Sequence, residues 1–219
     1  MMRRQGRSAD NATRTMTRMI SEGSPGTVAA WLPSLLLAVV SALLQAAGAN
    51  VNEALRYERV AVEGGEWWRL VTANLVHLGW WHWFLNALSL GLLVLLCPEP
   101  ARPSEWLVRV LTIGAGMSLG LYLLVPALGI YVGLSGLVYG LFALGFGRQI
   151  AAGDRFAIAC LAFLAARIVW ELVWGAPQSE QDLIGGAVVA ESHLTGVIAA
   201  ALYGVATGAF RRPRRLPAP

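Results

Sequence analysis

The hydrophobic residues of this chain fall into long runs, each bounded by short polar segments. A helix needs about 20 predominantly apolar residues to cross the hydrocarbon core of a bilayer. Proline, glycine and charged residues interrupt the apolar pattern between the runs, for example at Pro103, at Gly153 and at Pro177. The pattern therefore predicts six membrane-spanning helices, at residues 28–48, 70–96, 106–126, 133–150, 156–175 and 190–210.

The segments that flank these runs have a different character. Residues 1–27 are polar and rich in arginine, so we expect a flexible basic tail there. Residues 28–210 are expected to form one six-span domain, and residues 211–219 a second basic tail. The first apolar run is too long for the hydrophobic part of a cleaved signal peptide and lacks a small-residue cleavage site, so we expect it to remain in the protein.

Composition agrees with a location in the membrane. Hydrophobic residues make up 56% of the 219 residues and charged residues only 14%, whereas soluble domains carry about 25% charged residues. These values exclude an ordinary soluble domain and a disordered chain. The two cysteines, Cys97 and Cys160, are too few for a disulfide framework. We therefore expect an all-α membrane protein surrounded by the lipid bilayer.

The placement of charge predicts the orientation of the helices. All 17 basic residues are arginines, and the net charge of +4 could by itself suggest nucleic-acid binding. In a membrane chain the positions of the arginines matter more. Thirteen lie on one side of the predicted spans and three, Arg56, Arg59 and Arg69, on the other, with Arg167 inside a span. Because cytoplasmic segments carry an excess of arginine and lysine, we expect both termini in the cytoplasm, the acidic segment 177–191 outside, and no nucleic-acid partner.

Polar side chains inside the predicted spans mark the candidate chemistry, because such groups are costly in a membrane and usually have a function. With this orientation, the second, fourth and sixth spans all run from outside to inside. At about 1.5 Å per residue, their polar residues His82, Ser135 and His193 are predicted to lie at similar depth in the outer half of the bilayer. A hydroxyl beside an imidazole is the arrangement of a serine nucleophile with its general base.

Two local patterns add groups that could stabilise an oxyanion. Ser135 lies between Gly133 and Gly136, which allows a loop to turn into a helix whose first amides are unpaired. His82 and Asn86 are four residues apart and share a helix face, from which both can donate hydrogen bonds to a developing negative charge.

Each pattern also has a structural explanation. Small residues and polar side chains such as Ser135, His82 and Asn86 can simply pack membrane helices together. Arg167 and Glu171 are also four residues apart and can neutralise each other within the fifth span. A metal site formed by His82, His193 and Glu191 is conceivable, but no spacing typical of a metal motif accompanies these residues. We therefore expect neither a metal nor another cofactor.

In their order along the chain, these residues resemble the motifs of the rhomboid intramembrane serine proteases. The sequence Glu66-Trp67-Trp68-Arg69 is similar to the Trp-Arg motif of the first external loop in that family. Three further patterns match: His-x4-His-x3-Asn in the second span, Gly-x-Ser-Gly with a following tyrosine in the fourth, and His-x-x-Gly in the sixth. The first pattern consists of His77, His82 and Asn86. The second consists of Gly133, Leu134, Ser135, Gly136 and Tyr139, and the third of His193 and Gly196.

The resemblance implies a six-helix rhomboid-like bundle and a Ser135–His193 catalytic dyad. It further implies an oxyanion hole formed by His82, Asn86 and the backbone amides of Leu134 and Ser135. Supporting roles fall to Gly133, Gly136, Tyr139, Trp68, Arg69 and His77. Two departures stand out: Ala200 replaces a glycine common in the sixth span, which questions how closely the fourth and sixth spans pack, and Ser192 stands where alanine is common.

Within the family, the segments around Trp68, Ser135 and His193 look most like the rhombosortase subgroup, as does the charge at Arg167 with Glu171. This similarity implies cleavage of the C-terminal Gly-Gly-type transmembrane sorting tail of exported proteins, in a bacterial inner membrane, with a multi-pass enzyme whose active site faces the periplasm. An inactive rhomboid-like protein that binds transmembrane clients is an alternative, and a small transporter is a weaker one. The sequence leaves the oligomeric state open.

Overall fold

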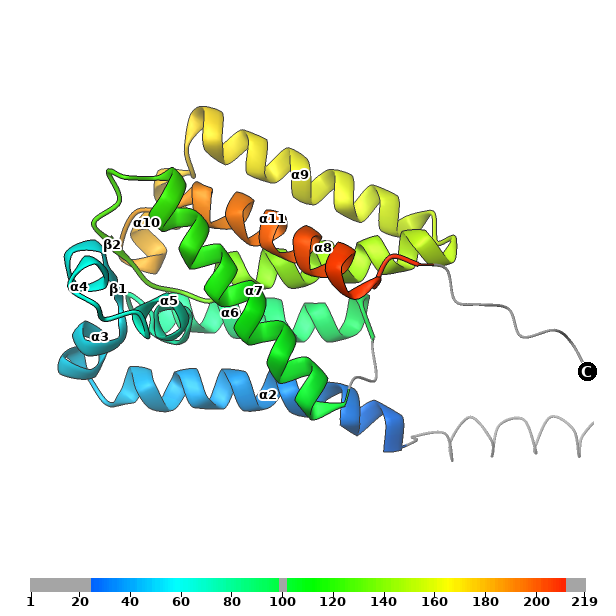
Figure 1. Cartoon of the computed structure of the whole chain (residues 1–219), viewed down its shortest axis with the longest axis horizontal. Coiled ribbons are helices and arrows are strands. Elements are labelled where there is room, and N and C mark those ends of the chain that lie inside the picture. The colour runs from blue at the N-terminus through cyan, green and yellow to red at the C-terminus, as the bar shows by residue number, and fades with distance from the viewer. Residues whose placement is uncertain (1–24, 99–101, 212–219) are drawn as a thin grey trace, which may run out of the picture.

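The computed structural model describes residues 25–98 and 102–211, and six long helices dominate this part of the chain. They occupy the positions of the six predicted spans. The helices α8 and α11 pack against each other, α7 packs on α11, α9 packs on α8, and α2 packs on α6 (Figure 1). Their bounds are α2 Pro25–Ala46, α6 Trp80–Leu96, α7 Pro103–Leu124, α8 Ser135–Ala152, α9 Phe156–Trp174 and α11 Ala190–Thr207.

Among the described residues, the helices α7 and α9 are long and apolar enough to cross a membrane. A third span is obtained if residues Arg69–Leu75 and the helix α6 are taken together, since they are joined by a break with a bend of 91°. The apolar part of α2, Ala30–Ala46, is shorter. Length and composition thus indicate a helical membrane protein with two or three spans by these criteria.

The short elements gather at one end of the bundle, on the left in Figure 1, where α2 ends and α11 begins. The strands β1 and β2 pair antiparallel, with Tyr57 opposite Tyr131 and Glu58 opposite Ile130. The described part of the chain is otherwise helical, as the all-α prediction expects, and strand pairs of two residues have no periodic pattern in the sequence by which to predict them. The short elements are α3 Ala49–Leu55, β1 Tyr57–Glu58, α4 Arg59–Glu63, α5 Arg69–Thr72, η1 Ala73–Leu75, β2 Ile130–Tyr131 and α10 Gln178–Ile184.

The predicted second span, residues 70–96, is not one continuous helix. Its first part forms α5 and η1, and α6 begins only at Trp80. The Asn74 side-chain amide donates to the backbone carbonyls of Leu70 and Val71 at 3.3 and 3.1 Å, and such local bonds compete with helix continuation. Gly79 is fully extended just before α6. Because the segment is apolar in composition, the sequence predicts one span where the structure has a break between Leu75 and Trp80.

The other helix ends differ from the prediction by a few residues. The helix α2 begins at Pro25, inside the predicted tail 1–27, and α7 begins at Pro103. Proline is favoured in the first turn of a helix, where its missing N–H would have no partner. The predicted basic tails otherwise lie outside the described residues, which exclude 1–24 and 212–219.

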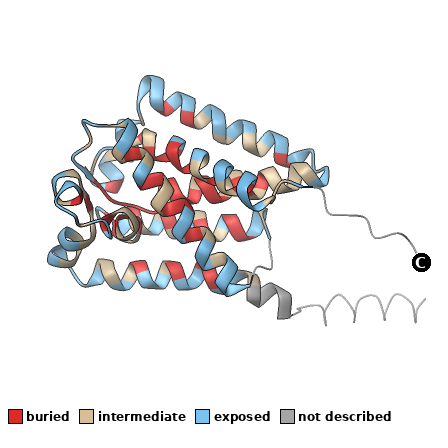
Figure 2. Ribbon diagram, viewed as in Figure 1, coloured by how far each residue is buried: buried red, intermediate tan, exposed pale blue. Residues whose placement is uncertain are grey.

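Buried residues concentrate where α7, α8 and α11 meet, whereas α2 and α9 are largely exposed (Figure 2). The exposed faces are apolar: Phe163 is 74% exposed and Val173 62%. Apolar surface of this extent is unfavourable in water and suits contact with lipid chains. The core residues Ile113, Leu134 and Leu137 fix the position of α8 at the centre of the bundle.

Candidate active site

Glycines bring the first turns of α8 and α11 into backbone contact. A Cβ atom on Gly136 would lie 2.7 Å from the carbonyl oxygen of Ser192, and one on Gly140 would lie 2.6 Å from that of Gly196. A Cβ on Gly196 would overlap the Gly136 carbonyl. Ala200 is fully buried in the same interface. The two helices therefore pack closely although Ala200 replaces the expected glycine, and Ser135 lies beside the start of α11.

Ser135 is the first residue of α8, at the end of a tightly held loop. Gly133 has a φ of +126°, a conformation that favours glycine. Its amide donates to the carbonyl of Ala73 at 3.0 Å, and its carbonyl accepts a hydrogen bond from the Tyr131 hydroxyl at 2.9 Å. Burial raises the pKa of Tyr131, which keeps this hydroxyl a donor. The loop thus delivers Ser135 to a helix N-terminus with unpaired amides.

His193 lies in the first turn of α11 and is held on two sides. Its ring stacks on Tyr139, with 4.0 Å between ring centroids and 5° between the planes. Its Nδ1 atom lies 2.6 Å from the carboxylate of Glu171 in α9. The stacking on Tyr139 agrees with the supporting role that the sequence assigned to this residue. The contact with Glu171 was not among the sequence predictions.

His82 and Asn86 lie on the buried face of α6, as their spacing predicts. The backbone amide of Leu78 donates to His82 Nδ1 at 3.3 Å. The proton of a neutral His82 ring is then on Nε2, where it can be donated. The Asn86 side-chain amide donates one hydrogen to the carbonyl of His82 at 2.9 Å and keeps a second for another acceptor. Both side chains can therefore serve as hydrogen-bond donors.

A cavity of about 420 Å³ joins these groups. Ser135 and His193 line it together with His82, Asn86 and Tyr139. Glu180 and Ile184 of the short helix α10 form part of its wall; both lie in the acidic segment 177–191. A serine hydroxyl, two imidazoles and a side-chain amide thus line one cavity, as the convergence of the second, fourth and sixth predicted spans implied.

The remaining supporting residues lie outside this cavity. His77 is fully buried behind His82, and the two rings meet edge to face with 5.1 Å between centroids. Leu134 is buried in the core directly before Ser135, and the Trp68 ring is 54% exposed. The metal alternative has no support in the described residues, where His82, His193 and Glu191 form no group suited to a metal ion.

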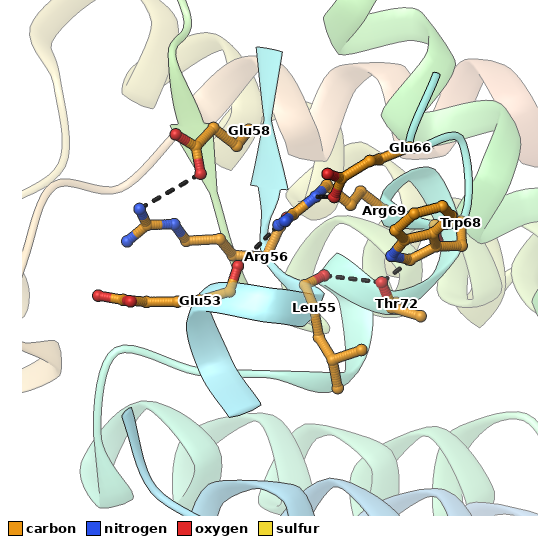
Figure 3. A network of polar contacts seen from close by, with 8 residues as sticks. All are labelled: Glu53, Leu55, Arg56, Glu58, Glu66, Trp68, Arg69 and Thr72. Carbon is orange, nitrogen blue, oxygen red and sulfur yellow. Dashed lines mark hydrogen bonds and ion pairs between the residues drawn. The ribbon is translucent and has the colours of Figure 1, made fainter. Parts of the chain in front are cut away.

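Arg69 fixes the segment between α2 and α6 (Figure 3). Its guanidinium pairs with Glu66 at 2.6 Å and donates to the carbonyls of Glu53 and Arg56 at 2.7 and 2.8 Å. Close by, the hydroxyl of Thr72 donates to the Leu55 carbonyl at 2.7 Å. Arg69 therefore joins α3 to α5 at one end of the bundle.

The sequence prediction of an Arg167–Glu171 pair is confirmed, with 2.8 Å between Arg167 Nη2 and Glu171 Oε1. Arg167 also pairs with Glu180 at 2.5 Å. Sequence reasoning missed the contact from Glu171 to His193. A signal was present, because Glu171 lies near the end of the fifth predicted span and His193 near the start of the sixth, so two consecutive antiparallel helices would bring them to the same end of the bundle.

Comparisons with known proteins find a family model and a relative that match this chain. A family model described as the rhomboid domain matches residues 64–210, more than half of the chain. The chain is 32% identical over 83 residues to a protein of Bacillus subtilis (strain 168) named "Putative rhomboid protease YdcA". The aligned part covers 38% of this chain and 42% of that relative, so the match spans less than half of either protein. The family model includes all residues of the cavity.

Proposed function

The chain belongs to the rhomboid family, and on this premise we propose that it is an intramembrane serine endopeptidase in which Ser135 is the nucleophile and His193 the general base. The observation that carries the proposal is the cavity in which Ser135, His193, His82 and Asn86 meet. A hydroxyl alone is a weak nucleophile, and a neighbouring base is the usual means of activating it.

The proposed reaction is acyl transfer in two stages. His193 accepts the proton of the Ser135 hydroxyl while its oxygen attacks the carbonyl carbon of the scissile bond. The resulting oxyanion is bound by His82 Nε2–H, the Asn86 amide and the backbone amides of Leu134 and Ser135. The C–N bond then breaks, and His193 gives the proton to the departing amine. In the second stage, water gives a proton to His193 and attacks the carbonyl carbon of the ester on Ser135. The ester C–O bond breaks, and His193 returns the proton to the oxygen of Ser135.

We propose that six spans place this cavity in the outer half of the membrane, with both termini in the cytoplasm. The arginine distribution supports this orientation. The cavity is lined by residues of α10 and β2. These elements lie at one end of the bundle, whereas α2 begins and α11 ends at the opposite end (Figure 1). In a bacterium, the site then opens toward the periplasmic side of the inner membrane.

The proposed substrates are membrane-anchored proteins with a glycine-rich segment beside a C-terminal transmembrane helix. Backbone hydrogen bonds within a helix protect its peptide bonds from proteolytic attack. Glycine weakens a helix by about 1 kcal/mol relative to alanine. A Gly-Gly segment therefore adopts the extended backbone that cleavage requires more readily. The substrate reaches the cavity between α6 and α9. The short helix α10 closes this route: it contacts α6, and its Glu180 pairs with Arg167 of α9.

The experiment is cleavage of a single-span substrate in liposomes, with Gly-Gly or Leu-Leu before its transmembrane helix. We expect the wild-type protein to cleave the Gly-Gly substrate and the Ser135→Ala variant to be inactive. Cleavage of both substrates at the same rate would contradict the substrate class but not the protease. Binding of substrate by both proteins without cleavage by either would favour the alternative of a client-binding protein.

A further inference from the structure

We infer that Glu171 is a positioning residue for His193, so that the site works as a Ser135–His193–Glu171 triad rather than as a dyad. The inference rests on the protease function proposed above. It starts from an unusual location: the Glu171 side chain is 0% exposed, within an apolar helix whose other faces are turned outward. A carboxylate in such a place is costly unless it is paired with a cation and accepts a hydrogen bond.

The two oxygens of Glu171 face different partners. Oε1 forms an ion pair with Arg167 Nη2 at 2.8 Å without hydrogen-bond geometry, and Oε2 lies at hydrogen-bond distance, 2.6 Å, from His193 Nδ1. Arg167 already pairs with Glu180 at 2.5 Å, so Glu171 is not required to neutralise it. Neutralising Arg167 would also not require the contact between Glu171 and His193. Arg167 therefore holds one edge of the carboxylate and leaves the other edge directed at the imidazole.

The contact with Glu171 selects the form of His193 that can act as a base. A carboxylate only accepts hydrogen bonds, so a neutral His193 must carry its proton on Nδ1 to bind Glu171. The lone pair is then on Nε2, the nitrogen left to receive a proton from the hydroxyl of Ser135 in the shared cavity. Stacking on Tyr139 fixes the plane of the same ring. Together, the two contacts fix both the tautomer and the orientation of the imidazole.

The charges around the ring favour the same step. Glu171, Arg167 and Glu180 together carry one net negative charge. When His193 accepts the proton of Ser135 it becomes positive, directly beside the buried carboxylate of Glu171. A fixed charge that faces a charge developing in the transition state lowers the barrier more in a dry site than in water. Glu171 thus acts through His193 and does not touch the substrate.

The test compares Glu171→Gln with wild type in the full-length protein. Glutamine keeps the shape, but its NH₂ group can donate to His193 Nδ1 and so stabilise the wrong tautomer. In a serine protease triad, the corresponding carboxylate-to-amide change lowers kcat by about 10⁴-fold. We expect labelling of Ser135 by a fluorophosphonate probe to slow by about 10²- to 10⁴-fold, with kcat reduced and KM for the liposome substrate unchanged. Glu191→Gln, a carboxylate in the same turn as His193, is the matched control and should retain the wild-type rate.

A second readout separates positioning from general structural damage. The chain has only three histidines, so ¹⁵N NMR of histidine-labelled protein can follow His193, assigned by its loss in His193→Gln. We expect the Nδ1–H form in wild type and a shift toward the Nε2–H form in Glu171→Gln. Wild-type labelling by Glu171→Gln, or slow labelling with an unchanged tautomer, would overturn the role of Glu171. Absence of labelling in wild type itself would instead contradict the proposed protease function.

Discussion

Gly196 of α11 lies so close to the carbonyl group of Gly136 in α8 that no Cβ atom fits between them. This contact sets the spacing of the two helices that carry His193 and Ser135. Because both residues lie within one turn of the contact, the distance between the proposed base and nucleophile depends directly on it. Small residues have this function in many membrane proteins, where they let helix backbones approach closely.

The first prediction follows from this packing. Gly196→Ala is expected to force α8 and α11 apart and to lower stability by about 3 kcal/mol or more, at or above the upper end for overpacked cores. Protease activity should fall with it. Gly129→Ala is the control, because a Cβ there meets nothing within 4 Å. The stability of both variants is measured by thermal unfolding in detergent. Equal melting temperatures for the two variants would contradict the close contact between Gly196 and Gly136.

The second prediction concerns the oxyanion hole. His82→Ala and Asn86→Ala are each expected to lower kcat by about 10²- to 10³-fold, the usual effect of removing one donor. The hydroxyl of Ser135 remains present in both variants, so the loss reports on the transition state. Cleavage assays in liposomes give kcat and KM for each. Full activity of Asn86→Ala would remove Asn86 from this role and leave the rest of the mechanism intact.

The third prediction tests the loop that Arg69 fixes. Arg69→Gln loses an ion pair with Glu66 and two charged hydrogen bonds to carbonyls, each worth about 1.5–3 kcal/mol. We expect a loss of stability of several kcal/mol. Arg102→Gln is the control: its side chain is 85% exposed and pairs with Glu105 at 4.0 Å, a contact worth about 0–1 kcal/mol. Similar melting temperatures for the two variants would disprove the supporting role of Arg69.

The fourth prediction is the orientation of the chain in the membrane. Reporter fusions after Pro219 should indicate the cytoplasm, and fusions within 177–190 should indicate the outside, because arginine is concentrated on the side of the termini. A phosphatase that is active only outside and a fluorescent protein that folds only inside provide matched readouts. The opposite pattern would place the cavity on the cytoplasmic side.

The sequence predicted the long helices well, since runs bounded by residues such as Pro103 and Gly153 carry a strong periodic and compositional signal. It failed at residues 70–79, where η1 ends at Leu75 and α6 begins only at Trp80, because this break lies inside an apolar run. The convergence of Ser135, His82 and His193 on one cavity was predictable, because the sequence expects these residues at similar positions in three helices that run in the same direction. Glu171 was missed because Arg167, one turn away, offered a sufficient local partner; a contact between separate helices leaves no spacing pattern.

The central claim is that Ser135 and His193 form one reactive unit, and covalent labelling tests it most directly. Purified protein is treated with a fluorophosphonate, and the modified residue is located by peptide mass spectrometry. We predict labelling of wild type at Ser135, none in Ser135→Ala, and strongly reduced labelling in His193→Ala, because the hydroxyl lacks its base. In cleavage assays, the double variant should lose little more activity than either single variant, since groups that share one step are not additive. Labelling at another residue, or cleavage by Ser135→Ala at the wild-type rate, would contradict the account.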